Sequence, residues 1–544
     1  MISLIFLSIL TTAWAQECPD VNKAPLCPNS GSTLLDDTYP TQAFVVSTEG
    51  FHTQKKGKLS TNNYLETNIQ MPAKFITNIM LSYSKDYPDI LVPTYEDDFA
   101  ELKLAVTKNL KEANVPQKEI DLQLAKIKIV DAHPYTWQQD FFESFVNLET
   151  GKPDLRSITS YDKAPMSSQA YTSLIAKSVN CGTEGKGLAK KKLSGTEVGG
   201  VTKSSANPKL LSGEYSWGNG EMGGNIEGLP GGLCLKANNQ ASSFVKEYCG
   251  SESNFVEIDV GWLEVGHSDE LVKVVPTFPK GSPAECSFSI MVASPDAAME
   301  TLKDSDYANR PFIELGTKDP ETIKNKIKDV VGSKAGKRLC QVLKDNYIVP
   351  GKDGAKKDGA SQAFMKILSQ FSLDAHAGSG SASGFSCEAA LKDISNRKML
   401  DLLSKDEDFV ETNRLVQEKM NKAKADMEAK LKERMPQCKN VNFINAPNLF
   451  YNDVFAEIDG SKVLPQPGRA GSLFPNPTNA VLANETLIIS ETPSFALNDK
   501  LSKMLKQNGL KSSFVDTWNY AHKGDGNLHC SSHSIPYCQP RGKQ

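Results

Sequence analysis

Long apolar runs are scarce in this chain of 544 residues, and no stretch after residue 15 is apolar over enough length to span a bilayer. An excess of positive charge is also lacking, since the formal net charge is −4 at pH 7 and the pI is near 6.1. Nucleic acids and anionic membranes require a concentrated basic face, so neither is expected as a partner.

The first residues, MISLIFLSILTTAWA, carry no charge and end in the small-x-small pattern Ala13-Trp14-Ala15. An apolar segment followed by small residues is typical of a secretory signal peptide, although the usual basic start is missing here. We therefore expect residues 1–15 to be removed and the protein to be secreted. A buried N-terminal strand and an uncleaved anchor are the alternatives.

The number of cysteines is odd, at eleven. Disulfides form in pairs in an oxidising compartment, so at least one thiol would stay unpaired or bond to another molecule. Short loops would join Cys18 with Cys27 and Cys234 with Cys249, although spacing alone does not determine the connectivity.

Helix and strand patterns alternate along the chain and predict the α/β class. Residues 16–67 are rich in Pro, Ser, Thr, Asn and Gly, and predict a loosely structured N-terminal extension apart from one strand at 43–46. Residues 68–544 are predicted to form the catalytic domain, with long loops over 181–235.

Two kinds of periodicity give the remaining elements. Helical spacing runs from Phe99 to Leu110 and stops at Pro116, and a second helix is predicted with Val416, Met420, Ala423, Met427 and Leu431 on one buried stripe. Strands are predicted at 125–130, 256–260, 288–293, 487–489 and 514–515. Gly-rich segments at 351–362 and 377–384 indicate flexible surface insertions.

Three short islands supply a thiol, an imidazole and two carboxylates, at 137–140 (WQQD), 266–270 (GHSDE) and 528–530 (LHC). A nucleophilic cysteine with a separate histidine is a pattern of covalent catalysis. Two carboxylates beside it suit a planar guanidinium held by bidentate pairing. The combination indicates arginine chemistry.

Taken in order, these islands resemble the catalytic domain of the protein-arginine deiminases, a branch of the guanidino-group-modifying pentein superfamily. The matching segments are Trp137-x-Gln139-Asp140-x-x-Glu143, Gly224-Asn225-Ile226-Glu227, Val265-Gly266-His267-Ser268-Asp269-Glu270, residues 444–450 and residues 514–530. The resemblance extends from about residue 70 to residue 531.

The resemblance implies a pentein fold, a five-bladed propeller of ββαβ units with long loop insertions, and hydrolysis of peptidyl-arginine to peptidyl-citrulline with release of ammonia. Asp140 and Asp269 would accept hydrogen bonds from the guanidinium and leave its carbon open to the Cys530 thiolate. His267 would protonate the departing ammonia and then activate the water that hydrolyses the thiouronium intermediate. Trp137 would form a wall against the arginine stem.

Calcium is the second implication of the resemblance. The expected ligands are the side chains of Gln139, Glu143 and Glu227 and the backbone carbonyls of Gly223 and Ile226. These are hard oxygen donors of the kind that Ca²⁺ prefers. Ion binding next to Asp140 would position that carboxylate and make activity calcium dependent. A second calcium ion is not expected, because Phe141 replaces the carboxylate that would bind it.

One departure from the family bears on the substrate. The arginine pair that grips the substrate backbone has no clear counterpart in residues 157–166, and Arg156 and Lys163 are only weak candidates. A pentein hydrolase of free arginine or agmatine is therefore an alternative.

An inactive secreted binding protein on the same scaffold is the alternative from another class. That hypothesis would gain if Cys530 were disulfide-bonded to Cys538. His529 is expected to shape the loop beside Cys530 rather than to act in catalysis.

Overall fold

The structure is a computed structural model. It describes residues 24–28, 34–48, 65–132, 134, 136–157, 168–179, 184–187, 197–198, 201–202, 224, 226–238, 249–277, 284–317, 319–347, 386–452, 455–458, 461–464, 470–522 and 526–541. The predicted signal peptide and both predicted Gly-rich insertions lie outside these residues. No helix among the described residues is long and apolar enough to cross a membrane.

Five sheets in the described part of the chain share one pairing pattern. Their strand orders are β4-β5-β6, β9-β10-β11, β12-β13-β14, β19-β20-β21 and β22-β1-β2-β3. The first strand of each sheet pairs antiparallel with the second, and the second pairs parallel with the third. The predicted mixed α/β class is confirmed, and the arrangement of the five units as a propeller stays a prediction.

The strands of these sheets are β1 (Thr41–Val46), β2 (Asp89–Pro93), β3 (Ile127–Val130), β4 (Phe142–Val146), β5 (Pro153–Ser157), β6 (Glu184–Gly187), β9 (Ile226–Leu229), β10 (Leu233–Ala237), β11 (Phe255–Ile258), β12 (Val272–Pro276), β13 (Phe288–Ser294), β14 (Asn442–Pro447), β19 (Val481–Ala483), β20 (Thr486–Ser490), β21 (Lys511–Val515) and β22 (Ser532–Pro536). Shorter strands are β7 (Glu197–Val198), β8 (Val201–Thr202), β15 (Phe450–Tyr451), β16 (Ala456–Ile458), β17 (Ser461–Val463) and β18 (Gly471–Ser472).

The helices are α1 (Leu65–Leu81), α2 (Glu96–Glu112), α3 (Gln117–Leu124), α4 (Ser168–Ser178), α6 (Pro295–Lys303), α7 (Pro320–Gly332), α8 (Lys334–Tyr347), α10 (Cys387–Asp393), α11 (Asn396–Leu403), α12 (Glu407–Arg434) and α13 (Phe495–Gln507).

The connections follow from the pairing. An antiparallel pair needs only a tight turn, and Gly231 and Gly232 between β9 and β10 supply the positive φ angles of 77° and 71° that such a turn uses. A parallel pair needs a longer crossover. Helix α1 lies between β1 and β2, α4 between β5 and β6, and α13 between β20 and β21.

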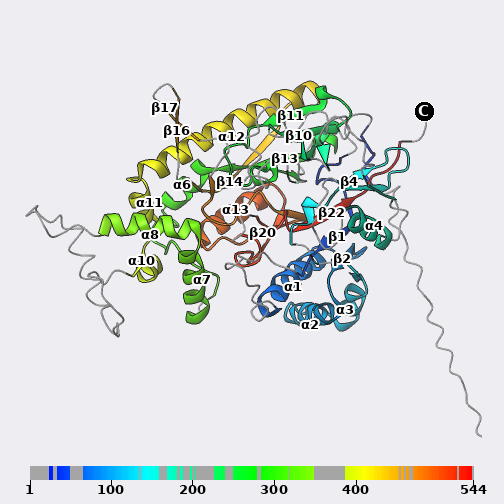
Figure 1. The fold of residues 1–544 in the computed structure, drawn as a ribbon, viewed down its shortest axis with the longest axis horizontal. Helices are drawn as coiled ribbons and strands as arrows, with labels where there is room; N and C mark the ends of the chain where they lie inside the picture. The colour runs from blue at the N-terminus through cyan, green and yellow to red at the C-terminus, as the bar shows by residue number, and fades with distance from the viewer. Residues whose placement is uncertain are drawn as a thin grey trace, which may run out of the picture.

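The long helix α12 covers one side of the molecule and runs along β10, β11 and β13 (Figure 1). Its stripe of Val416, Met420, Ala423, Met427 and Leu431 is buried against core residues of those strands. This confirms the interpretation of the two methionines as core residues.

The predicted helix after Phe99 is present as α2, whose buried stripe is Leu102, Val106 and Leu110. The structure adds α3, which the sequence analysis did not predict. The first helical pattern is predicted to stop at Pro116, and α2 ends before it at Glu112. Pro116 is also the residue just before α3. Proline is well tolerated at a helix start, because the first amide groups have no partner within the helix.

The strand predicted at 43–46 within the expected N-terminal extension is confirmed as β1, which starts two residues earlier at Thr41. Strand β1 lies between β22 and β2, and Ala43, Phe44 and Val45 are fully buried. A strand that is hydrogen-bonded on both edges is part of the domain core. The predicted domain boundary at 67 and 68 is otherwise untested.

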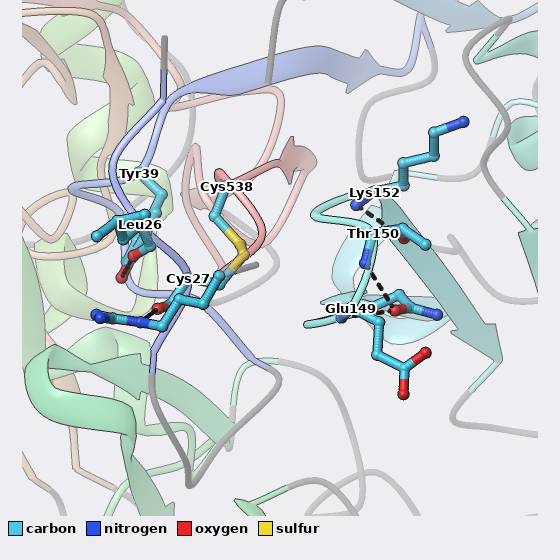
Figure 2. Close-up of a disulfide and its surroundings, with 9 residues drawn as sticks. Leu26, Cys27, Tyr39, Glu149, Thr150, Lys152 and Cys538 are labelled. Atoms are coloured by element: carbon cyan, nitrogen blue, oxygen red, sulfur yellow. Dashed lines mark hydrogen bonds between the residues drawn. A yellow bond between two sulfur atoms is a disulfide. The ribbon is translucent and has the colours of Figure 1, made fainter. Parts of the chain in front are cut away.

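Four disulfides are described: Cys27–Cys538, Cys234–Cys249, Cys286–Cys438 and Cys340–Cys387. The predicted Cys234–Cys249 bridge is confirmed, and the predicted Cys18–Cys27 bridge is wrong. Cys27 instead bonds to a residue 511 positions away, at a Cα–Cα distance of 5.0 Å (Figure 2). The pairing of β1 with β22 brings the segments that hold Cys27 and Cys538 together, although they are far apart in the sequence.

The same N-terminal segment holds a buried carboxyl group, Asp36. Burial raises its pKa from 3.8 to about 6, and hydrogen bonds from the amide and hydroxyl groups of Thr38 offset part of this rise. The unfolded carboxyl ionises first as the pH rises, so stability falls between the unfolded and the folded pKa. Asp36→Asn should therefore raise the free energy of unfolding by up to about 3 kcal/mol at pH 8.

This gain should shrink as the pH falls toward the pKa of the unfolded carboxyl. Urea unfolding across this pH range measures it, with Asp401→Asn at an exposed position as control. A difference between Asp36→Asn and wild type that does not change with pH would contradict the prediction.

Candidate active site

The candidate site residues share a place in the fold, because they lie just before or at the start of the first strand of each of the five sheets. Gln139 and Asp140 precede β4 in the turn η2 (Gln138–Asp140), Gly224 precedes β9, Asp269 precedes β12 in the turn η7 (Ser268–Glu270), Asn479 precedes β19, and Cys530 precedes β22. Segments far apart in the sequence thereby meet at one point.

Cys530 is the only described cysteine that is not in a disulfide, and it is buried. Its Sγ lies 3.1 Å from Asn479 Nδ2 and 3.5 Å from Asp269 Oδ2. Burial, followed by the charge of Asp269, raises the pKa of the Cys530 thiol well above 9. Because Cys538 is bonded to Cys27, the disulfide that would have favoured an inactive scaffold is absent.

His267 faces this thiol. A ring nitrogen of His267, a carboxylate oxygen of Asp269 and Cys530 Sγ all lie within 4.8 Å of one another. His267 Nε2 is buried without a hydrogen-bond partner. Burial lowers the pKa of His267, and the charge of Asp269 opposes this effect only in part. The imidazole is therefore neutral at pH 7 and able to accept a proton.

Asp269 is fully buried, and its two oxygens have different surroundings. Oδ2 lies 2.9 Å from His529 Nδ1 and accepts a hydrogen bond from Asn479 Nδ2 at 2.7 Å. Oδ1 has no partner. Burial alone would raise the pKa of Asp269, but the hydrogen bond and charge of His529, with the charges of His267 and Lys273, lower it overall. An ionised carboxylate with one open oxygen suits a guanidinium N–H donor.

Asp140 ends the turn η2, and the side chain of this residue is outside the described part of the structure. The turn itself lies against the nucleophile loop, since the Gln139 amide is 3.4 Å from the Cys530 carbonyl oxygen. Gln139 Nε2 also lies 3.1 Å from His529 Nε2. His529 thus contacts both Gln139 and Asp269, and the substrate-binding role of Asp140 stays a prediction.

Trp137 is half-buried and lies against the segment before Cys530. A Cβ atom at Gly526 would be 2.3 Å from Trp137 Cζ3. The glycine therefore lets the indole ring approach the backbone closely. The role of Trp137 as a wall for the substrate stays a prediction.

A group of acidic side chains lies next to Asp269. Glu143 is buried, and burial followed by the charge of Glu227 raises its pKa well above 4.5. Burial likewise raises the pKa of Glu227 to about 7, although the charges of His529 and Lys273 oppose the rise. Oε1 of both glutamates is buried without a hydrogen-bond partner.

Oxygens that accept no hydrogen bond, on a buried Glu143 and a half-buried Glu227 that interact with each other, fit a hard cation such as Ca²⁺. Glu143, Glu227 and Gln139 are the described residues whose side chains would hold it. Ile226, whose backbone carbonyl is an expected ligand, is the first residue of β9 and immediately precedes Glu227. Gly223 lies outside the described residues.

Sequence reasoning missed three residues of this region: Asn479, Lys273 and Asp37. Asn479 lies in the segment NPTN, which is indistinguishable from an ordinary turn. Lys273 carries a visible signal, because a lysine inside the apolar strand VKVVP is unusual. Asp37 was hidden in the presumed extension.

This arrangement defines a cysteine-dependent hydrolase of the deiminase type, with a carboxylate for a cationic group and an imidazole beside the thiol. A model of the protein-arginine deiminase family matches residues 137–537. The chain belongs to this family, whose enzymes hydrolyse amidine C–N bonds on a pentein-type fold.

Solved structures that resemble the chain are distant in sequence. An agmatine deiminase from C. jejuni has 12% identity and a TM-score of 0.39, covering 94% of this chain and 96% of its own. A protein provisionally named a peptidyl-arginine deiminase has 12% identity and a TM-score of 0.40, covering 92% and 98%. No curated protein sequence matches the chain.

Gly224 allows a test of the site geometry. A Cβ atom there would lie 2.6 Å from His267 Nδ1 and 3.1 Å from Asp269 Oδ1. Gly224→Ala should therefore displace the imidazole and lower kcat/KM roughly 100-fold. Ammonia release measures the loss, and Gly316→Ala, where a Cβ meets nothing within 4 Å, is the matched control. Equal activity of the two variants would contradict the described packing of Gly224.

Proposed function

We propose that this protein is a secreted, calcium-dependent hydrolase that converts peptidyl-arginine to peptidyl-citrulline and ammonia. The observation that carries the proposal is the free, buried thiol of Cys530 within reach of His267 and Asp269. A thiol, a neutral imidazole and an open carboxylate are what addition to a guanidinium carbon requires.

In the first half of the reaction, Asp269 holds the guanidinium and Cys530 attacks its central carbon. The thiol proton passes to His267, whose Nε2 has no other partner. The cationic substrate stabilises the developing thiolate, which burial alone would disfavour. His267 then gives the proton to one nitrogen, which leaves as ammonia, and an S-alkylthiouronium remains on Cys530.

In the second half, His267 removes a proton from water as the water oxygen bonds to the thiouronium carbon. The C–S bond breaks, His267 returns the proton to sulfur, and the released ammonia carries one proton away as ammonium. The product is a urea, as in citrulline. The same imidazole acts as base and acid in both halves.

Calcium, when bound to Glu143, Glu227 and Gln139, would supply fixed positive charge beside Asp269. Gln139 adjoins Asp140 in the turn η2, and Gln139 also contacts His529. Restraint of Gln139 would therefore orient the turn that carries Asp140. These links support a calcium requirement for activity.

A second candidate is hydrolysis of free arginine or agmatine, and the surroundings of Arg156 favour it. Its Nε and Nη2 donate to Asp154 Oδ2 at 3.2 and 3.0 Å, and its guanidinium lies 5.1 Å from the centre of the Phe145 ring. Arg156 is thus held within its own sheet rather than aimed at a peptide. Lys163 lies outside the described residues.

The test compares a blocked arginine peptide, free arginine and agmatine as substrates of the purified protein, each with calcium and with chelator. Ureido product and ammonia are measured, and Cys530→Ala is the blank. Calcium-dependent product from the peptide, absent in the blank, supports the proposal. Product from agmatine or free arginine alone supports the second candidate, and no product from any substrate overturns both.

A further inference from the structure

Lys273 is a fully buried lysine in the middle of strand β12. Its neighbours Val272 and Val274 pack into the core on one face of the strand, so Lys273 lies on the opposite face. Its side chain is 1% exposed. A buried ammonium group is strongly unfavourable unless negative charge surrounds it, so the residue must have partners.

The partners are carboxylates from three separate chain segments. Lys273 Nζ lies 2.8 Å from Asp37 Oδ2, in the loop before β1. Glu227 on β9 and Asp269 in η7 also interact with the ammonium electrostatically. Burial would lower the pKa of Lys273, but these three carboxylates raise it overall, so the amino group is charged at neutral pH.

The charges in this cluster do not balance. Glu143 interacts with Glu227, Asp269 and Asp37, and all four carboxylates therefore share one region. The basic groups that face them are the buried ammonium of Lys273 and the imidazole of His529, which lies 2.9 Å from Asp269 Oδ2 and 3.8 Å from Glu227 Oε1. Oε1 of Glu143 and Oε1 of Glu227 accept no hydrogen bond, which leaves acceptors for a further cation.

We propose that Lys273 is a built-in counter-ion of the calcium site, which holds Asp37, Glu227 and Asp269 together before calcium binds. This inference rests on the calcium requirement of the proposed function. The fixed charge stabilises the calcium-free form of the site. The same charge repels the incoming ion, so Lys273 makes calcium binding weaker and the active site less dependent on it.

Loss of the Lys273 charge should lower the stability of the calcium-free protein but raise its affinity for calcium. These opposite effects distinguish a counter-ion from a residue that only fills space. Lys273→Met keeps the length and the apolar stem but removes the charge. The calcium-free variant should unfold at a lower temperature, because Asp37, Glu227 and Asp269 then lose the buried positive charge that faces them. Its affinity for calcium should increase, because the competing charge is gone. A residue that only filled space would lower stability equally with and without calcium.

The experiment is calcium titration by calorimetry, with thermal unfolding in chelator and in calcium, on wild type, Lys273→Met and Lys273→Arg. We expect Lys273→Met to bind calcium roughly tenfold more tightly, and to gain more thermal stability from calcium than wild type gains. Lys273→Arg retains the charge and should stay close to wild type in both measurements. Lys273→Met is purified in calcium, where the ion restores the missing charge.

The outcomes separate this inference from the proposed function. Unchanged calcium affinity with equal destabilisation in both conditions overturns the inference and leaves a calcium-dependent wild-type hydrolase intact. Failure of Lys273→Met to fold in calcium also overturns it. Binding by Lys273→Met but not by wild type upholds the counter-ion and overturns the calcium part of the proposed function. If neither protein binds calcium, the inference and the calcium part of the proposed function are both overturned. The assay of ureido product then still tests whether the protein hydrolyses a guanidino substrate.

Discussion

Replacing Cys530 by serine should reduce ammonia release from every guanidino substrate by roughly four orders of magnitude or more. Serine keeps nearly the same volume and can still meet Asn479 Nδ2, which lies 3.1 Å from the sulfur. A buried hydroxyl beside the Asp269 carboxylate loses its proton far less readily than a thiol. The loss should therefore be in chemistry alone, with an unchanged unfolding temperature.

The pH dependence of the wild-type enzyme gives a second measurement on the same residue. Because burial and Asp269 raise the pKa of the Cys530 thiol, the thiol form prevails at neutral pH and the thiolate fraction grows as the pH rises. Alkylation of Cys530 in the substrate-free enzyme by iodoacetamide, measured on the peptide that contains Cys530, should accelerate with pH well beyond pH 8, and Cys530→Ser should lack this label. A loss of activity in Cys530→Ser far smaller than expected, or alkylation that is already maximal at pH 7, would contradict the assignment of Cys530.

The islands at 266–270 and 528–530 could be found from the sequence because each carries several chemically specific residues in a short stretch. His267, Asp269 and Cys530 are indeed brought together. The turn at 137–140 contacts the same site, because the Gln139 amide lies 3.4 Å from the Cys530 carbonyl oxygen. What the sequence did not reveal is that all these residues precede equivalent strands of repeated sheets, since the repeats share pairing rather than recognisable sequence.

Asp37 and the Cys27–Cys538 bridge were missed for a different reason. Both depend on the pairing of β1 with β22, a contact between opposite ends of the chain. Local patterns describe short-range propensity, and they contain no information on which distant strand completes a sheet. The sequence predicts a strand at 43–46, but it does not predict that this strand lies between β22 and β2 in the interior of a sheet.

Asn479 has no sequence signature at all, yet it contacts both Asp269 and Cys530. Its Nδ2 donates to Asp269 Oδ2 at 2.7 Å and lies 3.1 Å from Cys530 Sγ. Its Oδ1 accepts from the amides of His529 and Cys530 at 2.9 and 3.2 Å. One buried amide group thus sets the positions of the nucleophile and of the carboxylate that binds the guanidinium.

Asn479→Asp should lower kcat/KM roughly 1000-fold at neutral pH. The new carboxylate retains the acceptor for the two amides but replaces the donor with a negative charge beside Asp269. Like charges at this distance in a buried site disfavour both the second carboxylate and the thiolate. Ammonia release at saturating and limiting substrate measures the loss, and Asn484→Asp at an exposed hairpin position is the matched control.

The pH dependence distinguishes this electrostatic role from a loss of structure. At lower pH the introduced carboxyl group is protonated and regains a donor, so the ratio of variant to wild-type activity should rise as the pH falls. A misfolded site would give a constant ratio. Activity of Asn479→Asp equal to wild type at neutral pH would show that Asn479 does not hold Cys530 and Asp269 in their reactive positions, and a ratio independent of pH would remove the electrostatic explanation.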